Sequence, residues 1–268
     1  MQVYRGMDIG TAKPTPAQRA EVPHHLIDLA DPGESFTLTR FQAAFTAALA
    51  DIEARGRRAL LVGGTGLYLR AAVDGLTVPP QFPDVRAQLE RDPDTAALHA
   101  RLTELDPLGA SRMEPTNRRR VVRALEVTLG SGRPFSAHGA GLAVHPPTRF
   151  EMVGVWLPRP VVAQRIAVRV DTMLAGGWLD EVRSLAARPP GLSLTARQAL
   201  GYRELLAHVE GGVPFDETVD RIVSRTRAFA RRQRMWFRRD PRIRWVGAEG
   251  NPVALLPALL GDWARCPS

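Results

Sequence analysis

A short apolar strand pattern that runs directly into a glycine-rich turn limits the possible folds of this chain more than any other feature. Residues 58–62 form the strand pattern, residues 63–66 read Gly-Gly-Thr-Gly, and helical spacing begins at Leu67. This order directs backbone N–H groups and a helix N-terminus toward an anion. The turn therefore predicts an anion-binding site to which Thr65 would add a hydroxyl. The alternative is that Thr65 only caps the helix.

Strand and helix patterns alternate on both sides of this turn. Strand patterns occur at 25–29, 151–156 and 243–246, and helical spacing occurs at 38–52 and 215–238. Such alternation is typical of a parallel sheet with crossover helices. We therefore expect an α/β core built on a parallel sheet.

The middle of the chain has a different pattern. From about residue 74 to 147, polar helices are broken by prolines and glycines, and no convincing strand occurs. This pattern predicts an inserted helical subdomain. We expect residues 1–75 and 148–268 to form the core and residues 76–147 to form the insertion.

The positive charge of the chain is concentrated. The formal net charge is +8, and residues 221–244 hold ten arginines and one acidic residue. A second cluster consists of residues 118–120 and Arg123. Concentrated positive charge favours a phosphate-rich partner, because neutralised phosphates release their counterions. A solvated arginine-rich helix is the alternative for the longer cluster.

The helical pattern at 215–238 has one face with little charge. We expect this face to pack inward and the flanking arginines to face outward. The residues of the inward face are Ile222, Thr226, Phe229, Gln233 and Trp236.

Lys13 is the only lysine among 36 basic residues, and it lies in a Gly-Thr-Ala-Lys-Pro loop. An ammonium is more compact than a planar guanidinium. The loop therefore favours a position that only an ammonium fits, with chance survival of one lysine as the alternative.

Features of secreted or membrane proteins do not occur. No run of 18 or more residues is apolar, and the N-terminus lacks the basic-then-apolar order of a signal peptide. The single Cys266 closes no disulfide within the chain. We expect a cytoplasmic protein without a membrane partner.

Six segments, in order along the chain, resemble the successive motifs of the tRNA dimethylallyltransferases, also called IPP transferases. The segments are residues 2–14 (QVYRGMDIGTAKP), 23–28 (PHHLID), 61–68 (LVGGTGLY), 123–127 (RALEV), 201–204 (GYRE) and 231–237 (RRQRMWF). Ordered motifs that span nearly the whole chain are far more specific than one glycine-rich loop.

The resemblance implies a P-loop-type α/β core and a helical insertion that grips the anticodon arm of tRNA. The implied reaction moves a dimethylallyl group from dimethylallyl pyrophosphate to N6 of the adenine 3′ of the anticodon (position 37), in tRNAs that read codons beginning with U. A carboxylate takes the proton, while Mg²⁺ and hydrogen-bond donors stabilise the departing pyrophosphate. The resemblance also implies a monomer.

The resemblance assigns roles to individual residues. Thr65 matches the active-site threonine. The positions that match tRNA-contacting motifs are Gln2, Arg86, Arg119, Arg120, Val121, Val122 and Arg123. Possible contacts to the loop or to phosphate are Asp8, Lys13, Arg231 and Arg232. No set of residues has the spacing of a metal site.

Two other classes of function stay open. One is an RNA-binding remnant without catalysis. The other is a kinase or prenyltransferase that acts on a free nucleotide, although two separate basic clusters favour a large RNA.

The family motifs that precede Gln2 have no counterpart in the sequence. In the family these are a first strand, a Gly-x-x-x-x-Gly-Lys-Thr phosphate loop and a second strand ending in Asp-Ser, whose aspartate is the general base. We therefore expect the fold to lack its first strand and the chain to be inactive in this form. Either the start is an internal methionine of a longer protein, or the chain is a truncated product.

Overall fold

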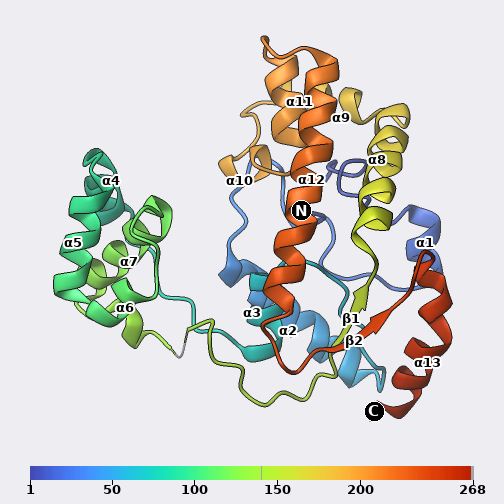
Figure 1. The fold of residues 1–268 in the computed structure, drawn as a ribbon, viewed down its shortest axis with the longest axis horizontal. Helices are drawn as coiled ribbons and strands as arrows, with labels where there is room; N and C mark the ends of the chain where they lie inside the picture. Colours follow the sequence, from blue (N-terminus) through green and yellow to red (C-terminus); the bar gives the residue numbers. More distant parts are fainter. Residues whose placement is uncertain (140, 267–268) are drawn as a thin grey trace. The chain divides into compact units, whose positions relative to one another are not determined.

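The computed structural model describes residues 1–139 and 141–266, and the chain folds as two units. The core unit comprises Met1–Val73 and Thr148–Ser268, and the helical unit comprises Asp74–Pro147. Figure 1 draws the helical unit in green. Each unit has its own hydrophobic cluster.

Helices make up most of the core unit (Figure 1). Its helices are α1 (Pro16–Glu21), α2 (Leu38–Ala54), α3 (Gly66–Asp74), α8 (Arg159–Ala175), α9 (Trp178–Ala186), α10 (Leu194–Arg197), α11 (Tyr202–Val209), α12 (Phe215–Phe237), η2 (Pro252–Leu255) and α13 (Leu256–Arg265). Their starts follow from local chemistry. At α1, for example, Thr15 and Gln18 form a capping box, and Pro16 occupies the first helical position.

The sheet of the core unit has two parallel strands in the described residues. Strand β1 (Val153–Trp156) pairs with β2 (Arg244–Gly247), in the register Val153↔Arg244. The close approach of the strands requires Gly154, because a Cβ there would lie 2.7 Å from the ring of Trp245. The sequence predicted both of these strands and their parallel relation.

Two predicted strands do not form, and this corrects the expected larger sheet. Residues 58–62 are irregular, with Leu60 and Val62 73% and 80% exposed, and no described strand lies beside them to complete hydrogen bonding. Residues 25–29 cannot be extended, because Leu26 and Asp28 have φ of 63° and 57°. Only the bridge Tyr4↔Ala30 forms there.

The main hydrophobic cluster of the core unit lies between the N-terminal loop, residues 1–15, and helices α9, α11 and α12. Tyr4 and Met7 from the loop pack with Trp178 of α9, Tyr202 of α11 and Ile222 of α12, all at most 2% exposed. The loop is therefore part of the core and not a surface appendage. Burial of these large side chains is its main anchor.

The long helix α12 is orange in Figure 1 and runs from α11 toward the turn before α3. The prediction that its low-charge face packs inward is confirmed for Ile222, which is buried, and wrong for Phe229 and Trp236. Phe229 and Trp236 are more than a third exposed. Two helices, α8 and α11, pack on α12. Near its C-terminal end, α12 contacts the glycine-rich turn instead, through Gln233 and Gly64.

The described residues of the helical unit form four α-helices and a short 3₁₀ turn. They are α4 (Pro83–Arg91), α5 (Thr95–Leu105), α6 (Pro107–Ser111), α7 (Arg118–Ser131) and η1 (Phe135–Ala137). Asp106 caps α6 at the Gly109 N–H (2.8 Å) and accepts from the Ser136 N–H (2.7 Å). Burial raises the pKa of Asp106, but the hydrogen bonds from Ser136 and Gly109 outweigh it, and the pKa lies below its ordinary value.

Across the described ranges, no helix is both long enough and apolar enough to cross a bilayer.

Candidate functional site

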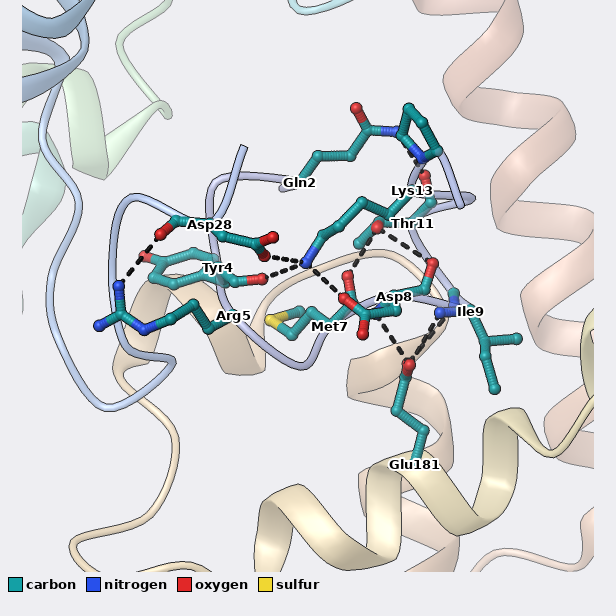
Figure 2. A network of polar contacts seen from close by, with 12 residues as sticks. Gln2, Tyr4, Arg5, Met7, Asp8, Ile9, Thr11, Lys13, Asp28 and Glu181 are labelled. Carbon is teal, nitrogen blue, oxygen red and sulfur yellow. Dashed lines mark hydrogen bonds and ion pairs between the residues drawn. The ribbon is translucent and has the colours of Figure 1, made fainter. Parts of the chain in front are cut away.

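The N-terminal loop is organised around the ammonium of Lys13 (Figure 2). Its Nζ donates to the Tyr4 carbonyl at 2.7 Å, to Asp8 Oδ1 at 2.5 Å and to Asp28 Oδ1 at 2.6 Å. The side chain is 2% exposed. Three donors therefore meet three acceptors in a buried position, which is what an ammonium supplies. Contact between Lys13 and phosphate stays a prediction, and this geometry favours an organising role.

Asp28 is shared by two cations. Lys13 binds its Oδ1, and Arg19 donates to its Oδ2 at 2.8 Å. Burial raises the pKa of Asp28, but the hydrogen bonds from Lys13 and Arg19 outweigh it, so the pKa lies below its ordinary value of 3.8. The Asp8 side chain is held by fewer contacts, since it is 58% exposed and only its Oδ1 accepts from Lys13.

A second carboxylate holds the same loop from the opposite side. Glu181 of α9 accepts from the backbone N–H groups of Asp8 (2.8 Å), Ile9 (2.7 Å) and, more weakly, Gly10 (3.4 Å). Figure 2 shows the Glu181 carboxylate below Asp8 and Ile9. Successive N–H groups of this kind form an anion-binding nest. In this protein the anion is the protein's own side chain.

Tyr202 completes this contact. Its hydroxyl donates to Glu181 Oε1 at 2.6 Å. Burial, followed by the hydrogen bond to Glu181, raises the pKa of Tyr202 far above its ordinary value, so the phenol stays protonated. The segments around residues 8 and 202, which the sequence singled out separately, are therefore joined through one carboxylate.

Gln2 lies on this organised loop. Its Nε2 donates to the carbonyls of Thr11 (3.1 Å) and Ala12 (3.0 Å), while its backbone carbonyl accepts from the Asp28 N–H at 3.1 Å. Both the main chain and the side-chain amide of Gln2 are thus fixed. A role in binding tRNA stays a prediction for this residue.

The glycine-rich turn lies against the C-terminal half of α12. Gln233 donates to the Gly64 carbonyl at 2.8 Å, and a Cβ on Gly66 would lie 2.1 Å from the Trp236 indole nitrogen. Thr65 between them is exposed, and its hydroxyl makes no hydrogen bond within the described ranges. The turn therefore presents a free hydroxyl beside the arginine-rich end of α12.

Arginines dominate this end of α12. Arg231 and Arg232 are exposed, and the Arg232 guanidinium lies 6.0 Å from the centre of the Phe229 ring. Arg234 lies over the Trp156 ring at 5.1 Å. Desolvation, and then repulsion from Arg238 and Arg159, lowers the pKa of Arg234. Crowded like charges of this kind favour an anionic partner.

Two predicted tRNA-binding arginines of the helical unit share one buried carboxylate. Glu126 of α7 is 2% exposed and accepts from Arg123 at 2.7 Å, from Arg86 at 3.4 Å and from the Phe82 N–H at 2.9 Å. Arg123 also donates to the Pro79 carbonyl at 2.8 Å. Arg86 and Arg123 are partly exposed, so both guanidiniums are fixed without being hidden.

The other predicted positions on α7 divide into two groups. Arg119 and Arg120 are exposed, and their side chains make no ion pair with described residues. Val121 and Val122 are buried in the cluster of the helical unit. In this conformation the two valines support the helix from inside, so RNA binding through them stays a prediction and would act through the helix they anchor.

Sequence reasoning assigned no role to Glu181 or to Glu126, although Glu126 lies in the motif at residues 123–127. Glu181 binds a loop 173 residues earlier in the chain, and no spacing rule reveals such a pair. Glu126 had a local signal, because it is the only acid between Arg118 and Ser131, in a helix whose neighbouring residues are apolar. A lone acid on a buried face needs a cationic partner.

A glycine-rich turn beside an arginine-rich helix, together with a second unit that holds its own arginines, is typical of proteins that bind the phosphates of a nucleic acid. The family model described as IPP transferase matches residues 2–240. The tRNA dimethylallyltransferase of Roseiflexus sp. (strain RS-1) is 49% identical over 94% of this chain and 84% of its own length. That of Geobacter metallireducens is 44% identical over 97% of this chain and 86% of its own.

Solved structures agree. The tRNA isopentenylpyrophosphate transferase of Bacillus halodurans superposes with a TM-score of 0.67 at 34% identity, covering 98% of this chain and 86% of that one. A eukaryotic dimethylallyltransferase acting on tRNA has a TM-score of 0.76 at 25% identity, covering 99% and 68%. The chain belongs to the IPP transferase family, which confirms the resemblance seen in its motifs.

Proposed function

We propose that this protein is a tRNA dimethylallyltransferase, which moves a dimethylallyl group from dimethylallyl pyrophosphate to N6 of the adenine 3′ of the anticodon. The observation that carries the proposal is the 49% identity, over nearly the whole chain, to a protein of that name. The placement of Thr65 beside the arginines of α12 supports it. The predicted preference for tRNAs that read codons beginning with U belongs to the same proposal.

The glycine-rich turn and α12 form the pyrophosphate side of the proposed site. The hydroxyl of Thr65 and the guanidiniums of Arg231 and Arg232 would bind phosphate oxygens, and such donors lower the barrier by stabilising charge on the leaving group. Asp8 and Lys13 would act less directly, by keeping the N-terminal loop in shape. In the family the proton acceptor is an aspartate that precedes Gln2, so we assign this role to no described residue.

We assign contacts with the tRNA backbone to the helical unit. Arg86 and Arg123 are held in fixed positions by Glu126, and Arg119 and Arg120 are free to follow the phosphate backbone. Phosphate contacts of this kind set the register of a nucleic acid and do not read its sequence. We assign recognition of the target base to Gln2 in the core unit.

Magnesium is expected with the pyrophosphate. Among the described residues, no group of three or more His, Cys, Asp or Glu side chains could hold a metal ion. Mg²⁺ usually binds phosphate oxygens and water, with one or two protein ligands. We therefore propose that Mg²⁺ would be held mainly by the pyrophosphate oxygens, and we assign no described residue to it. The predicted monomeric state and cytoplasmic location stay predictions.

The test is transfer of radiolabel from dimethylallyl pyrophosphate to an unmodified anticodon stem–loop. The comparisons do not support the expectation that the chain is inactive in this form. We therefore expect label on a stem–loop with adenine at the target position and none on a matched stem–loop with purine there, because purine lacks the amino group. The Thr65→Ala protein is the matched control for the site. Stem–loop binding without any transfer would overturn the proposal and leave an RNA-binding protein.

A further inference from the structure

Lys13 is connected to Gln2 by two separate routes. On one route, Lys13 binds the Asp28 carboxylate, and the Asp28 N–H holds the Gln2 carbonyl. On the other route, Lys13 binds Asp8 at the start of a turn whose carbonyls, at Thr11 and Ala12, hold the Gln2 amide. Figure 2 shows Asp8 and Asp28, one from each route, meeting at the ammonium.

The backbone at both contact points with Gln2 is strained. Ala12 has φ of 48° and Asp28 has φ of 57°, in the left-handed region that residues with a Cβ rarely adopt. Such conformations persist only where surrounding contacts over-determine them, and they gather at functional sites. Lys13 supplies those contacts at both points, through its own backbone N–H to the Asp8 carbonyl (2.9 Å) and through its ammonium to Asp28.

The fixed amide leaves one oxygen available. Both hydrogens of Gln2 Nε2 have carbonyl acceptors, so a flip of the side-chain amide would lose both hydrogen bonds. Gln2 Oε1 makes no hydrogen bond to any residue that the structure describes. A fixed acceptor complements the amino group of adenine and repels the O6 atom of guanine or hypoxanthine.

We propose that Lys13 is a positioning residue, whose ammonium fixes the N-terminal loop so that Gln2 presents its side-chain oxygen to the amino group of the target adenine. This inference rests on the proposed function. Lys13 itself touches no substrate. Its effect is on the choice of base and not on the binding of phosphates.

The experiment measures binding of two labelled stem–loops, identical except for adenine or purine at the target position. The unaltered protein should prefer adenine about five- to tenfold, which is the effect of one hydrogen bond. Lys13→Met should bind both with less than about twofold preference, while phosphate contacts keep most of the affinity. Arg19→Gln is the matched control, because it removes the other, more exposed cation from Asp28, and it should keep the preference.

A double-substitution cycle separates positioning from general damage. Gln2→Leu should abolish the preference, and adding Lys13→Met to it should cause no further loss, because both changes act on one contact. Lys13→Arg should behave like Lys13→Met, since a planar fork cannot replace three converging ammonium bonds. A Lys13→Met protein that still prefers adenine would overturn the inference.

Folding failure is controlled by rescue. Lys13→Ala leaves a space that ethylammonium fits and tetramethylammonium, which has no N–H donor, does not satisfy. Ethylammonium should restore the preference for adenine, and the absence of rescue would overturn the inference. Equal binding of both stem–loops by the unaltered protein would also overturn the inference. The label-transfer assay would then test the proposed function independently. Failure of label transfer would instead remove the proposed function on which the inference rests.

Discussion

The arginines of the helical unit and those of α12 carry the same charge, but the protein holds them differently. Arg86 and Arg123 are fixed by the buried Glu126, and Arg123 is fixed by a backbone carbonyl as well. Arg231 and Arg232 project from α12 without an ion pair to a described residue. Fixed guanidiniums can recognise the geometry of a phosphate, whereas loosely held ones mainly provide an attractive field.

This difference indicates a division of labour. We expect the fixed pair to set where the RNA lies, and the α12 arginines, with Thr65, to act on the pyrophosphate. Substitutions at Thr65, at Glu126 and at the arginines test this division.

The largest effect is expected from Thr65→Ala. Removal of the hydroxyl should lower the single-turnover transfer rate about a hundredfold, because a donor to developing charge is lost. Affinity for the stem–loop should change by less than about twofold, since Thr65 lies outside the helical unit. Thr65→Ser should retain most of the rate. If stem–loop affinity falls as much as the transfer rate, Thr65 also takes part in RNA binding, and the proposed division is wrong.

The next effect is expected from Glu126→Gln in the helical unit. The amide keeps the shape but cannot balance two guanidiniums, so the free energy of unfolding should fall by about 1–3 kcal/mol. Stem–loop affinity should fall with it. Glu90→Gln is the control, because Glu90 pairs with Arg86 at the surface, and its loss should cost less than about 1 kcal/mol. Urea unfolding of both proteins measures the difference, and equal losses would show that Glu126 has no special part.

Lysine substitutions compare the two arginine groups directly. Arg123→Lys should weaken stem–loop binding about tenfold, because the fork that bonds Glu126 and the Pro79 carbonyl is lost. The double change of Arg231 and Arg232 to lysine should alter binding of dimethylallyl pyrophosphate by less than about threefold, because the charge is kept. If the double change is the more harmful one, the α12 arginines bind by geometry and not as a field.

The smallest effect concerns pH. The folded-state pKa of Asp106 is depressed, so its contribution to stability is present above its ordinary value of 3.8 and is lost as pH falls through the lower folded value. Unfolding of the helical unit should therefore become easier below about pH 4. Asp106→Asn should be less stable near neutral pH and should lose less on acidification. A variant with the same acid sensitivity as the unaltered protein would contradict this.

Sequence patterns predicted those elements whose stability is local or pairwise. The helix at 215–238 was expected from its spacing and is found as α12, and the strands around residues 153 and 245 were expected and pair in parallel. Residues 58–62 show the limit, because an apolar strand pattern specifies a strand only when a partner completes its hydrogen bonds. Periodicity also cannot show that a helix is covered over only part of its length, as at Trp236.

The candidate site was predictable to a similar extent. The only lysine of the chain, Lys13 in the N-terminal loop, indicated a position for an ammonium, and the structure places that ammonium among three oxygens. The acceptor at the other side of the loop, Glu181, was not predictable, because residues that meet only in the fold leave no local pattern. Asp28, which has a left-handed backbone, likewise binds Lys13 and Arg19, and these contacts across 15 and 9 residues were not predicted from the sequence.

Nucleoside analysis of a full, unmodified tRNA transcript, after incubation with this protein, dimethylallyl pyrophosphate and Mg²⁺, tests the proposed transferase activity. We predict that mass spectrometry of the digest finds dimethylallyl-adenosine at one position, immediately 3′ of the anticodon, and that Thr65→Ala greatly reduces it. Unmodified adenosine at that position, under conditions in which the tRNA is bound, would contradict the account.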